Sequence, residues 1–190
     1  MVKYFKNGKE KAMELTLKLN ARLQPVHRFE IEDVLQDILE KTQRGEVTGG
    51  GTAQKPDGEI TYCDIEINLN DEEGNAEWLA QTVNALGIPK GSVLLGKERE
   101  INVGTLEGLA YYSNGTELPE EVYKSCDINY VIEQFELAME DSGQLYSWWE
   151  GASETALYFY GKSFDEMKRR IEPFISEYPL CQKSRIEKIA

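Results

Sequence analysis

The sequence predicts an α+β protein made of two similar halves, each with an antiparallel sheet that carries its helices on one face. Three observations predict this fold. Apolar and polar residues alternate over several short segments, which is typical of half-buried strands. Each half also contains two amphipathic patterns of helical period. The order of these segments repeats along the chain, and the paired helices are offset by about 97 and about 91 residues.

The first half contains the strand pattern that is easiest to read. Residues 61–69 alternate apolar and polar side chains directly after the turn signal Pro56-Asp57-Gly58. The helix over residues 75–86 ends where Gly87 and Pro89 close it. The predicted elements of this half are strands at 13–19, 46–53, 61–69 and 93–95, and helices at 30–41 and 75–86.

The second half repeats the order of the first. Asp127 is a suitable N-cap for the helix that follows it. Pro173 lies inside the last helical pattern, so a kink or an early break is expected there. The predicted elements of this half are strands at 106–112, 144–150, 155–160 and 184–189, and helices at 127–140 and 165–178.

Both halves therefore read strand, helix, strand, strand, helix, strand. This βαββαβ order is the ferredoxin-like arrangement, so the predicted fold is a tandem duplication of ferredoxin-like halves. The expected organisation is a polar N-terminal lead over residues 1–12, a first half over 13–100 and a second half over 101–190, which together could form one continuous domain. Each sheet would leave one face without helices, and that face must be solvated, packed or used for binding.

Composition and charge exclude several classes of protein. The chain has 190 residues, of which 41% are hydrophobic and 29% charged, and no apolar run approaches the length of a membrane span. Its formal net charge is −13, and a surface of this sign disfavours nucleic-acid binding. The N-terminal stretch lacks the apolar segment of a signal peptide. Three widely spaced cysteines give no disulfide framework, so the cytoplasm is the expected compartment.

His27 is the only histidine and thus the natural candidate for a general base. No nucleophile or orienting acid can be paired with it from spacing, so it could equally be an ordinary residue of a loop or helix start. A metal site is not expected, since nitrogen-ligand sites mostly need more than one histidine. No cofactor is expected either. The glycine run Gly49-Gly50-Gly51 lacks the lysine and following helix of a phosphate loop, so it indicates a bulged or bent edge strand.

Two surfaces are candidates for binding a ligand or a partner. The polar face of the strand at 61–69 presents Tyr62, Asp64 and Glu66, which suit a cation or a basic peptide, although a solvated face is the plainer interpretation. The predicted strands at 144–150 and 155–160 form an aromatic hairpin. This aromatic hairpin puts large rings on both sides of its sheet, and helices can cover only one side. Its other side would pack against the first half or hold a cationic ligand by cation–π attraction. The candidate residues in the hairpin are Trp148, Trp149, Glu150, Tyr158 and Tyr160.

The preferred hypothesis is a non-enzymatic binding or regulatory protein, such as an immunity or inhibitor protein, that holds a basic protein or a cationic small molecule. It depends on the thirteen carboxylates and only two lysines of residues 101–166. One alternative is an enzyme that acts on a small substrate with His27 as base near Asp64 or Glu66. A second alternative is a module that self-associates through strand edges, for example as a homodimer.

Overall fold

The computed structural model describes residues 12–190, so the expected lead over residues 1–12 lies outside the described residues except for Ala12. Two antiparallel sheets with helices form an α+β fold, as predicted. The elements of the first half are β1 (Ala12–Leu19), α1 (Pro25–Thr42), β2 (Gly45–Gln54), β3 (Ile60–Asn70), α2 (Asn75–Ala85), β4 (Ser92–Gly96) and β5 (Arg99–Val103). Those of the second half are β6 (Glu107–Asn114), α3 (Glu120–Ser125), α4 (Ile128–Met139), β7 (Gly143–Glu150), β8 (Glu154–Gly161), α5 (Phe164–Glu177), a 3₁₀ turn (Pro179–Cys181) and β9 (Arg185–Lys188).

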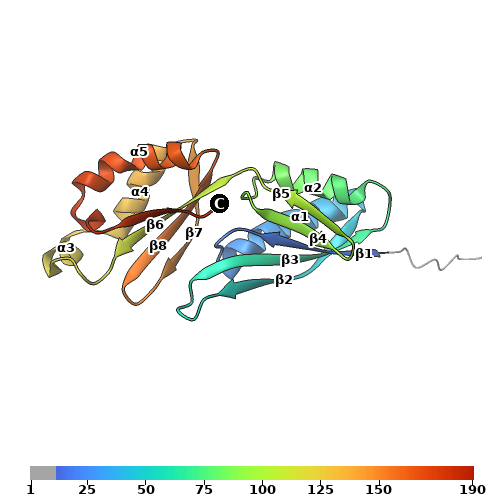
Figure 1. Cartoon of the computed structure of the whole chain (residues 1–190), viewed down its shortest axis with the longest axis horizontal. Coiled ribbons are helices and arrows are strands. Elements are labelled where there is room, and N and C mark those ends of the chain that lie inside the picture. Colours follow the sequence, from blue (N-terminus) through green and yellow to red (C-terminus); the bar gives the residue numbers. More distant parts are fainter. Residues whose placement is uncertain (1–11) are drawn as a thin grey trace, which may run out of the picture.

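The strand orders confirm the duplication. The first sheet is ordered β2-β3-β1-β4-β5 and the second β7-β8-β6-β9. Without β5, the strands of each half have the same spatial order. Counted along the sequence of that half, this order is second, third, first and fourth. This is the ferredoxin-like arrangement. The two halves lie next to each other along the long axis of the molecule, as Figure 1 shows.

Some elements differ from the prediction. The helix expected at 30–41 begins at Pro25, because proline suits the first helical position and its fixed φ favours the helix. Asp127 caps α4 as predicted, by accepting a hydrogen bond from the Asn129 amide. The early break at Pro173 does not occur, since α5 continues to Glu177. β5 and α3 were not predicted, because β5 is short and polar and α3 buries no residue that would give it an apolar stripe.

The glycine run forms part of an edge strand with a bulge, as expected. The register of β2 shifts between Val47 and Gly49. A Cβ at Gly50 would lie 2.3 Å from a carboxylate oxygen of Glu32 and 3.2 Å from Nε of Arg28. The buried Arg28 pairs with Glu32 at 2.7 Å and donates to Thr52 at 2.8 Å. The glycine therefore makes room for an ion pair within α1, whose arginine also bonds to Thr52 of β2.

The second sheet has a core on each of its faces. One face packs against α4 and α5 through residues such as Phe135, Phe159 and Ile171. The other face belongs to the same hydrophobic core as the first half. The residues that it contributes to this shared core are Ala110, Tyr112, Ala156, Tyr158 and Tyr160. The side of the second sheet that carries no helices is thus buried against the first half.

The segment between β1 and α1 is bound to the second half at every second residue. The Asn20 side chain donates to the Ile189 carbonyl at 3.4 Å, and the Arg22 amide donates to the Tyr160 hydroxyl at 2.9 Å. The Gln24 amide donates to Ser147 Oγ at 3.0 Å. This alternation fixes the start of α1 against β7 and β8.

Glu59 lies at the centre of a buried polar network between the halves. Its carboxylate accepts hydrogen bonds from Tyr112 at 2.6 Å and from Tyr158 at 3.1 Å. It also pairs with Arg22 and Lys55. Burial alone would raise the pKa of Glu59, but the bonds from Lys55, Tyr112, Arg22 and Tyr158 outweigh it and the pKa is lowered. The carboxylate is therefore held in its charged form.

Candidate functional site

A cleft opens between the halves, beside the start of α1, and we call it the inter-half cleft. It consists of two adjoining hollows of about 380 Å³ and about 200 Å³ that share four lining residues. The larger hollow adds mostly polar residues and the smaller one mostly apolar residues. The shared lining is Leu23, Glu30, Ile31 and Tyr146; the larger hollow adds His27, Gln144, Leu145, Ser147 and Trp148; the smaller adds Ala21, Val34, Leu86, Gly87, Ile88 and Pro89.

His27 reaches the cleft from the first turn of α1. Its Nδ1 lies 3.0 Å from Ser147 Oγ, and its ring meets Trp148 edge-on with 5.0 Å between the ring centroids. Within residues 12–190, no hydrogen bond is made by Nε2 of His27. One ring nitrogen is therefore held by the second half, and the other is left for a ligand.

Ser147 holds the imidazole in place. The side chain of Ser147 is buried, and its oxygen already accepts a hydrogen bond from the Gln24 amide. A serine oxygen has two lone pairs and one proton, so it can bond to either tautomer of His27. In the tautomer with the proton on Nδ1, that proton is donated to Ser147 and Nε2 is free to act as a base. Ser147 Oγ contacts both the Gln24 amide and His27 Nδ1, which suits a residue that positions His27.

A β-bulge aims two neighbouring side chains of β7 at the cleft. The register between β7 and β8 shifts between Leu145 and Ser147, which leaves Tyr146 as the extra residue. Leu145 packs into the core beneath the helices of the second half, whereas Tyr146 packs into the core shared with the first half. Without the bulge, Ser147 would lie on the same face as Leu145 and would not reach His27.

The Tyr146 hydroxyl lies at the apolar end of the cleft. Its ring meets the ring of Tyr160 edge-on at 5.2 Å, and burial raises its pKa. A Cβ at Gly87 would lie 3.8 Å from the hydroxyl oxygen. Gly87 has a φ of +77°, a conformation in which glycine is favoured. The turn after α2 therefore brings bare backbone close to the hydroxyl.

The predicted site residues lie in three places. His27 and Trp148 line the inter-half cleft, and Trp148 is 43% exposed. Tyr158 and Tyr160 are buried against the first half, and Trp149 is partly buried in the same core. Glu150 is exposed at the end of β7. The side of the hairpin that carries Tyr158 and Tyr160 is therefore packed against the first half.

The other three predicted residues lie on the face of the first sheet that carries no helices. Tyr62, Asp64 and Glu66 alternate along β3 with Cys63 and Ile65, which are buried in the core. The amine of Lys18 lies 4.1 Å from the centroid of the Tyr62 ring, in a cation–π contact on this face. His27 belongs to α1 and lines a different hollow from Glu66, so the predicted meeting of His27 with Asp64 or Glu66 does not occur. Binding of a cationic ligand on this face stays a prediction.

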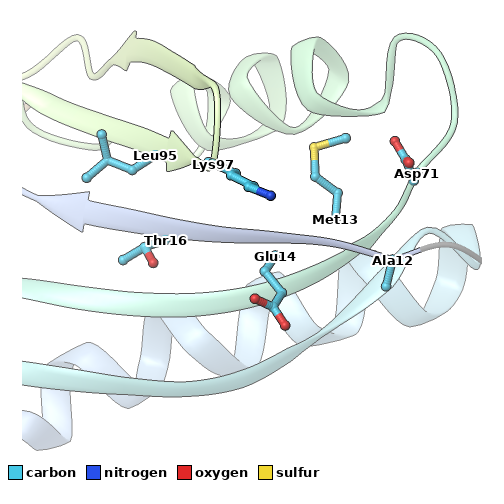
Figure 2. Close-up of a pocket in the computed structure, with 8 residues that line it drawn as sticks. Ala12, Met13, Glu14, Thr16, Asp71, Leu95 and Lys97 are labelled. Carbon is cyan, nitrogen blue, oxygen red and sulfur yellow. The ribbon is translucent and has the colours of Figure 1, made fainter.

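A further hollow of about 560 Å³ lies at the outer end of the first sheet. Figure 2 shows that its side chains are spread along the start of β1 and around the ends of the neighbouring segments. Glu14 and Thr16 point away from Met13 and Lys97, so no group of polar atoms converges on one point. This hollow is larger than either part of the inter-half cleft, but it lacks an oriented chemical group.

No cluster of three or more histidine, cysteine or acidic side chains suited to a metal ion occurs in residues 12–190. In the same part of the chain, no helix combines the length and the apolar character needed to cross a bilayer.

Comparison with known proteins gives only distant likenesses. No protein-family model matches the chain, and no curated protein matches it. A putative monooxygenase from Fusobacterium nucleatum is similar over 95% of this chain and 92% of its own, with 11% identity and a TM-score of 0.32. The first two RRM domains of the yeast poly(U)-binding protein Pub1 match over 93% and 99%, with 13% identity and a TM-score of 0.26. An anthrone oxidase-like protein matches over 96% and 95%, with 6% identity and a TM-score of 0.28.

These findings correct the preferred hypothesis from the sequence. A non-enzymatic binding or regulatory protein was expected, but two of the similar structures have the names of oxidising enzymes. The structure also buries Tyr158 and Tyr160, which were to form part of the binding surface. The hypothesis is therefore not kept. At such identities and TM-scores the neighbours do not indicate a reaction, so any chemistry must be argued from the cleft itself.

Proposed function

We propose that this chain is an enzyme that moves a proton on a small, mainly apolar substrate, with His27 as the general base in the inter-half cleft. The observation that carries the proposal is the orientation of His27. Ser147 from the other half fixes one ring nitrogen, and the opposite nitrogen has no hydrogen-bond partner among residues 12–190. Positioned histidines of this kind transfer protons efficiently near neutral pH.

The surroundings of His27 suit this role. The proton removed from the substrate would pass to Nε2, which converts the ring into an imidazolium. Ser147 Oγ can accept a hydrogen bond from Nδ1–H of that cation. The carboxylate of Glu30 lines the same cleft, and its negative charge favours the imidazolium. Most of the smaller hollow is apolar, which favours a substrate that leaves water on binding. The reverse transfer returns the proton to the product.

The experiment follows hydrogen–deuterium exchange of 2-indanone, an apolar ketone with acidic C–H bonds next to its carbonyl. The protein is purified without a histidine tag, so that His27 gives the only imidazole signals in the NMR spectrum. We expect exchange above the buffer rate that follows the deprotonated fraction of His27 as pH is varied. His27→Gln should lower the rate by about 10²-fold or to the buffer rate. Val26→Ala, an exposed change in the same turn of α1, should leave the rate unchanged.

Equal exchange rates for the wild type and His27→Gln would refute the proposal, as would a pH profile unrelated to the titration of His27. Ser147→Ala gives a further readout, because it removes the group that orients the ring, together with the acceptor of the Gln24 amide, and leaves His27 itself in place. We expect it to lower the exchange rate less than His27→Gln does and to alter the tautomer of His27, which nitrogen NMR detects.

The cytoplasm remains the proposed compartment. Cys63, Cys126 and Cys181 are all unpaired thiols, which supports a reducing environment.

A further inference from the structure

The Tyr146 hydroxyl is a polar group without a protein partner in a mostly apolar hollow. Among residues 12–190 it makes no hydrogen bond, although its ring is partly buried in the shared core. The neighbouring hydroxyls of Tyr112, Tyr158 and Tyr160 all have partners. Buried or half-buried hydroxyls normally find a partner, so one left open at a cleft is available to a ligand.

The bulge in β7 places the residue after Tyr146 on the same side of the sheet as Tyr146. Tyr146 is the inserted residue, and Ser147 follows it directly. Alternation from Leu145 already places Tyr146 on the side of the shared core, and the bulge keeps Ser147 on that same side, where it reaches His27. Bulges commonly redirect side chains next to active sites. Two consecutive residues of β7 thus serve the same cleft: Tyr146 provides a hydrogen-bond donor, and Ser147 positions the base His27.

The lining of the cleft limits the charge of what it can hold. Its residues include no lysine and no arginine, and Glu30 is its one carboxylate. The net charge of the chain is −13. A carboxylate or phosphate ligand would find no counter-charge here and would be repelled by the surrounding field. A neutral ligand loses little solvation free energy when it enters the cleft, provided that its polar atom forms a hydrogen bond there.

We propose that the inter-half cleft takes a neutral ring compound with one carbonyl or phenolic oxygen, and that the Tyr146 hydroxyl donates the hydrogen bond that holds this oxygen. The inference rests on the proposed function of His27 and names its substrate class. The phenol is protonated at neutral pH, since burial raises its pKa above the ordinary value of 10, so it acts as a donor. When His27 removes a proton next to the carbonyl, the electron pair of the C–H bond forms a C=C bond, and the π pair of the carbonyl moves onto the oxygen to give an enolate. The Tyr146 bond strengthens as that charge grows.

The test measures binding separately from catalysis. Two probes of the same shape, naphthalene and 2-naphthol, are titrated into wild-type protein and into Tyr146→Phe, with the NMR signals of His27 reporting occupancy of the cleft. We expect wild-type protein to bind 2-naphthol about 3- to 10-fold more tightly than naphthalene, as one hydrogen bond to a hydroxyl implies. Tyr146→Phe should remove that difference and change naphthalene affinity less than about 2-fold. Tyr130→Phe, on α4 and outside the cleft lining, is the matched control.

Two outcomes would overturn the inference: the same preference for 2-naphthol in Tyr146→Phe, or no change of the His27 signals with either probe. Since the hydroxyl has no hydrogen-bond partner in the described part of the chain, removing it should leave the unfolding midpoint unchanged, and an unchanged midpoint confirms that the variant is folded. Failure of the two proposals is distinguishable. If 2-indanone exchange depends on His27 while the preference survives in Tyr146→Phe, only the substrate class is wrong. If the preference depends on Tyr146 while exchange does not depend on His27, only the catalytic proposal is wrong.

Discussion

Replacing Glu59 by alanine should destabilise the protein more than most surface changes, because Glu59 holds the two halves together. Its side chain is 5% exposed and that of its partner Arg22 is 18% exposed. Alanine would leave Arg22 and the hydroxyls of Tyr112 and Tyr158 without their shared acceptor. Breaking a buried ion pair from one side costs about 3–5 kcal/mol. The lost tyrosine bonds belong to the same network, so their cost is not added separately.

Lys55 provides the matched control. It pairs with the same carboxylate, but its side chain is 46% exposed. An exposed ion pair contributes about 0–1 kcal/mol, so Lys55→Ala should cost no more than that. Urea denaturation followed by tryptophan fluorescence measures both variants. A loss below about 1 kcal/mol for Glu59→Ala, or an equal loss in both variants, would refute the view that the network joins the halves.

The same network predicts a dependence of stability on pH. The pKa of Glu59 is lowered below its ordinary value of 4.5 in the folded protein, so folding favours the carboxylate. The stabilisation is therefore fully present above pH 4.5 and is lost as pH falls through the folded pKa. Other carboxylates titrate in this range, among them Glu107, whose pKa is lowered to about 2 by bonds from the Phe164 amide, Lys90 and Lys188. The test is the difference between wild type and Glu59→Gln, which should shrink as pH falls below 4.5.

Three further predictions concern the supports of the fold. Gly50→Ala should cost about 1–3 kcal/mol because its Cβ would meet Glu32 and the backbone, whereas Gly51→Ala, with open space around it, should cost less than about 1 kcal/mol by urea denaturation. Asp127→Ala removes the cap of α4 and should lower stability by about 0.5–2 kcal/mol in the same assay. Phe135→Ala opens a cavity beneath α4 and should cost about 3–5 kcal/mol; a melting temperature equal to that of the wild type would contradict its place in the core.

Most of the fold could be predicted because local periodicity and the repeated order agree. The strand at residues 60–70 alternates cleanly, and α4 has both a capping aspartate and an apolar stripe. Elements without such a pattern were missed. α3 is a six-residue helix with no buried residue, and β5 pairs only at the edge of the first sheet. The early start of α1 was missed because Pro25 suits a loop as well as a first helical turn.

The candidate site was predicted only in part. His27 could be selected because it is the only histidine, but its partner could not be found from spacing. Ser147 lies 120 residues further on, in a strand whose alternation alone would place it elsewhere. A bulge is a property of the pairing between two strands, so the sequence of one strand does not reveal it. For the same reason Tyr146 looked like one more aromatic residue of the hairpin.

The duplication explains why the proposed site lies between the halves. Two similar halves could have left two equivalent open sheet faces, but the side chains on these faces differ. The second sheet presents Tyr158 and Tyr160, which bury well, whereas the first presents Asp64 and Glu66, which do not. Only the aromatic face can be covered by the other half, and covering it brings β7 against the start of α1. The acidic face has no comparable partner in the described chain and cannot form a second cleft of the same kind. His27 thus lies where β7 meets the start of α1, at the contact that covering the aromatic face creates.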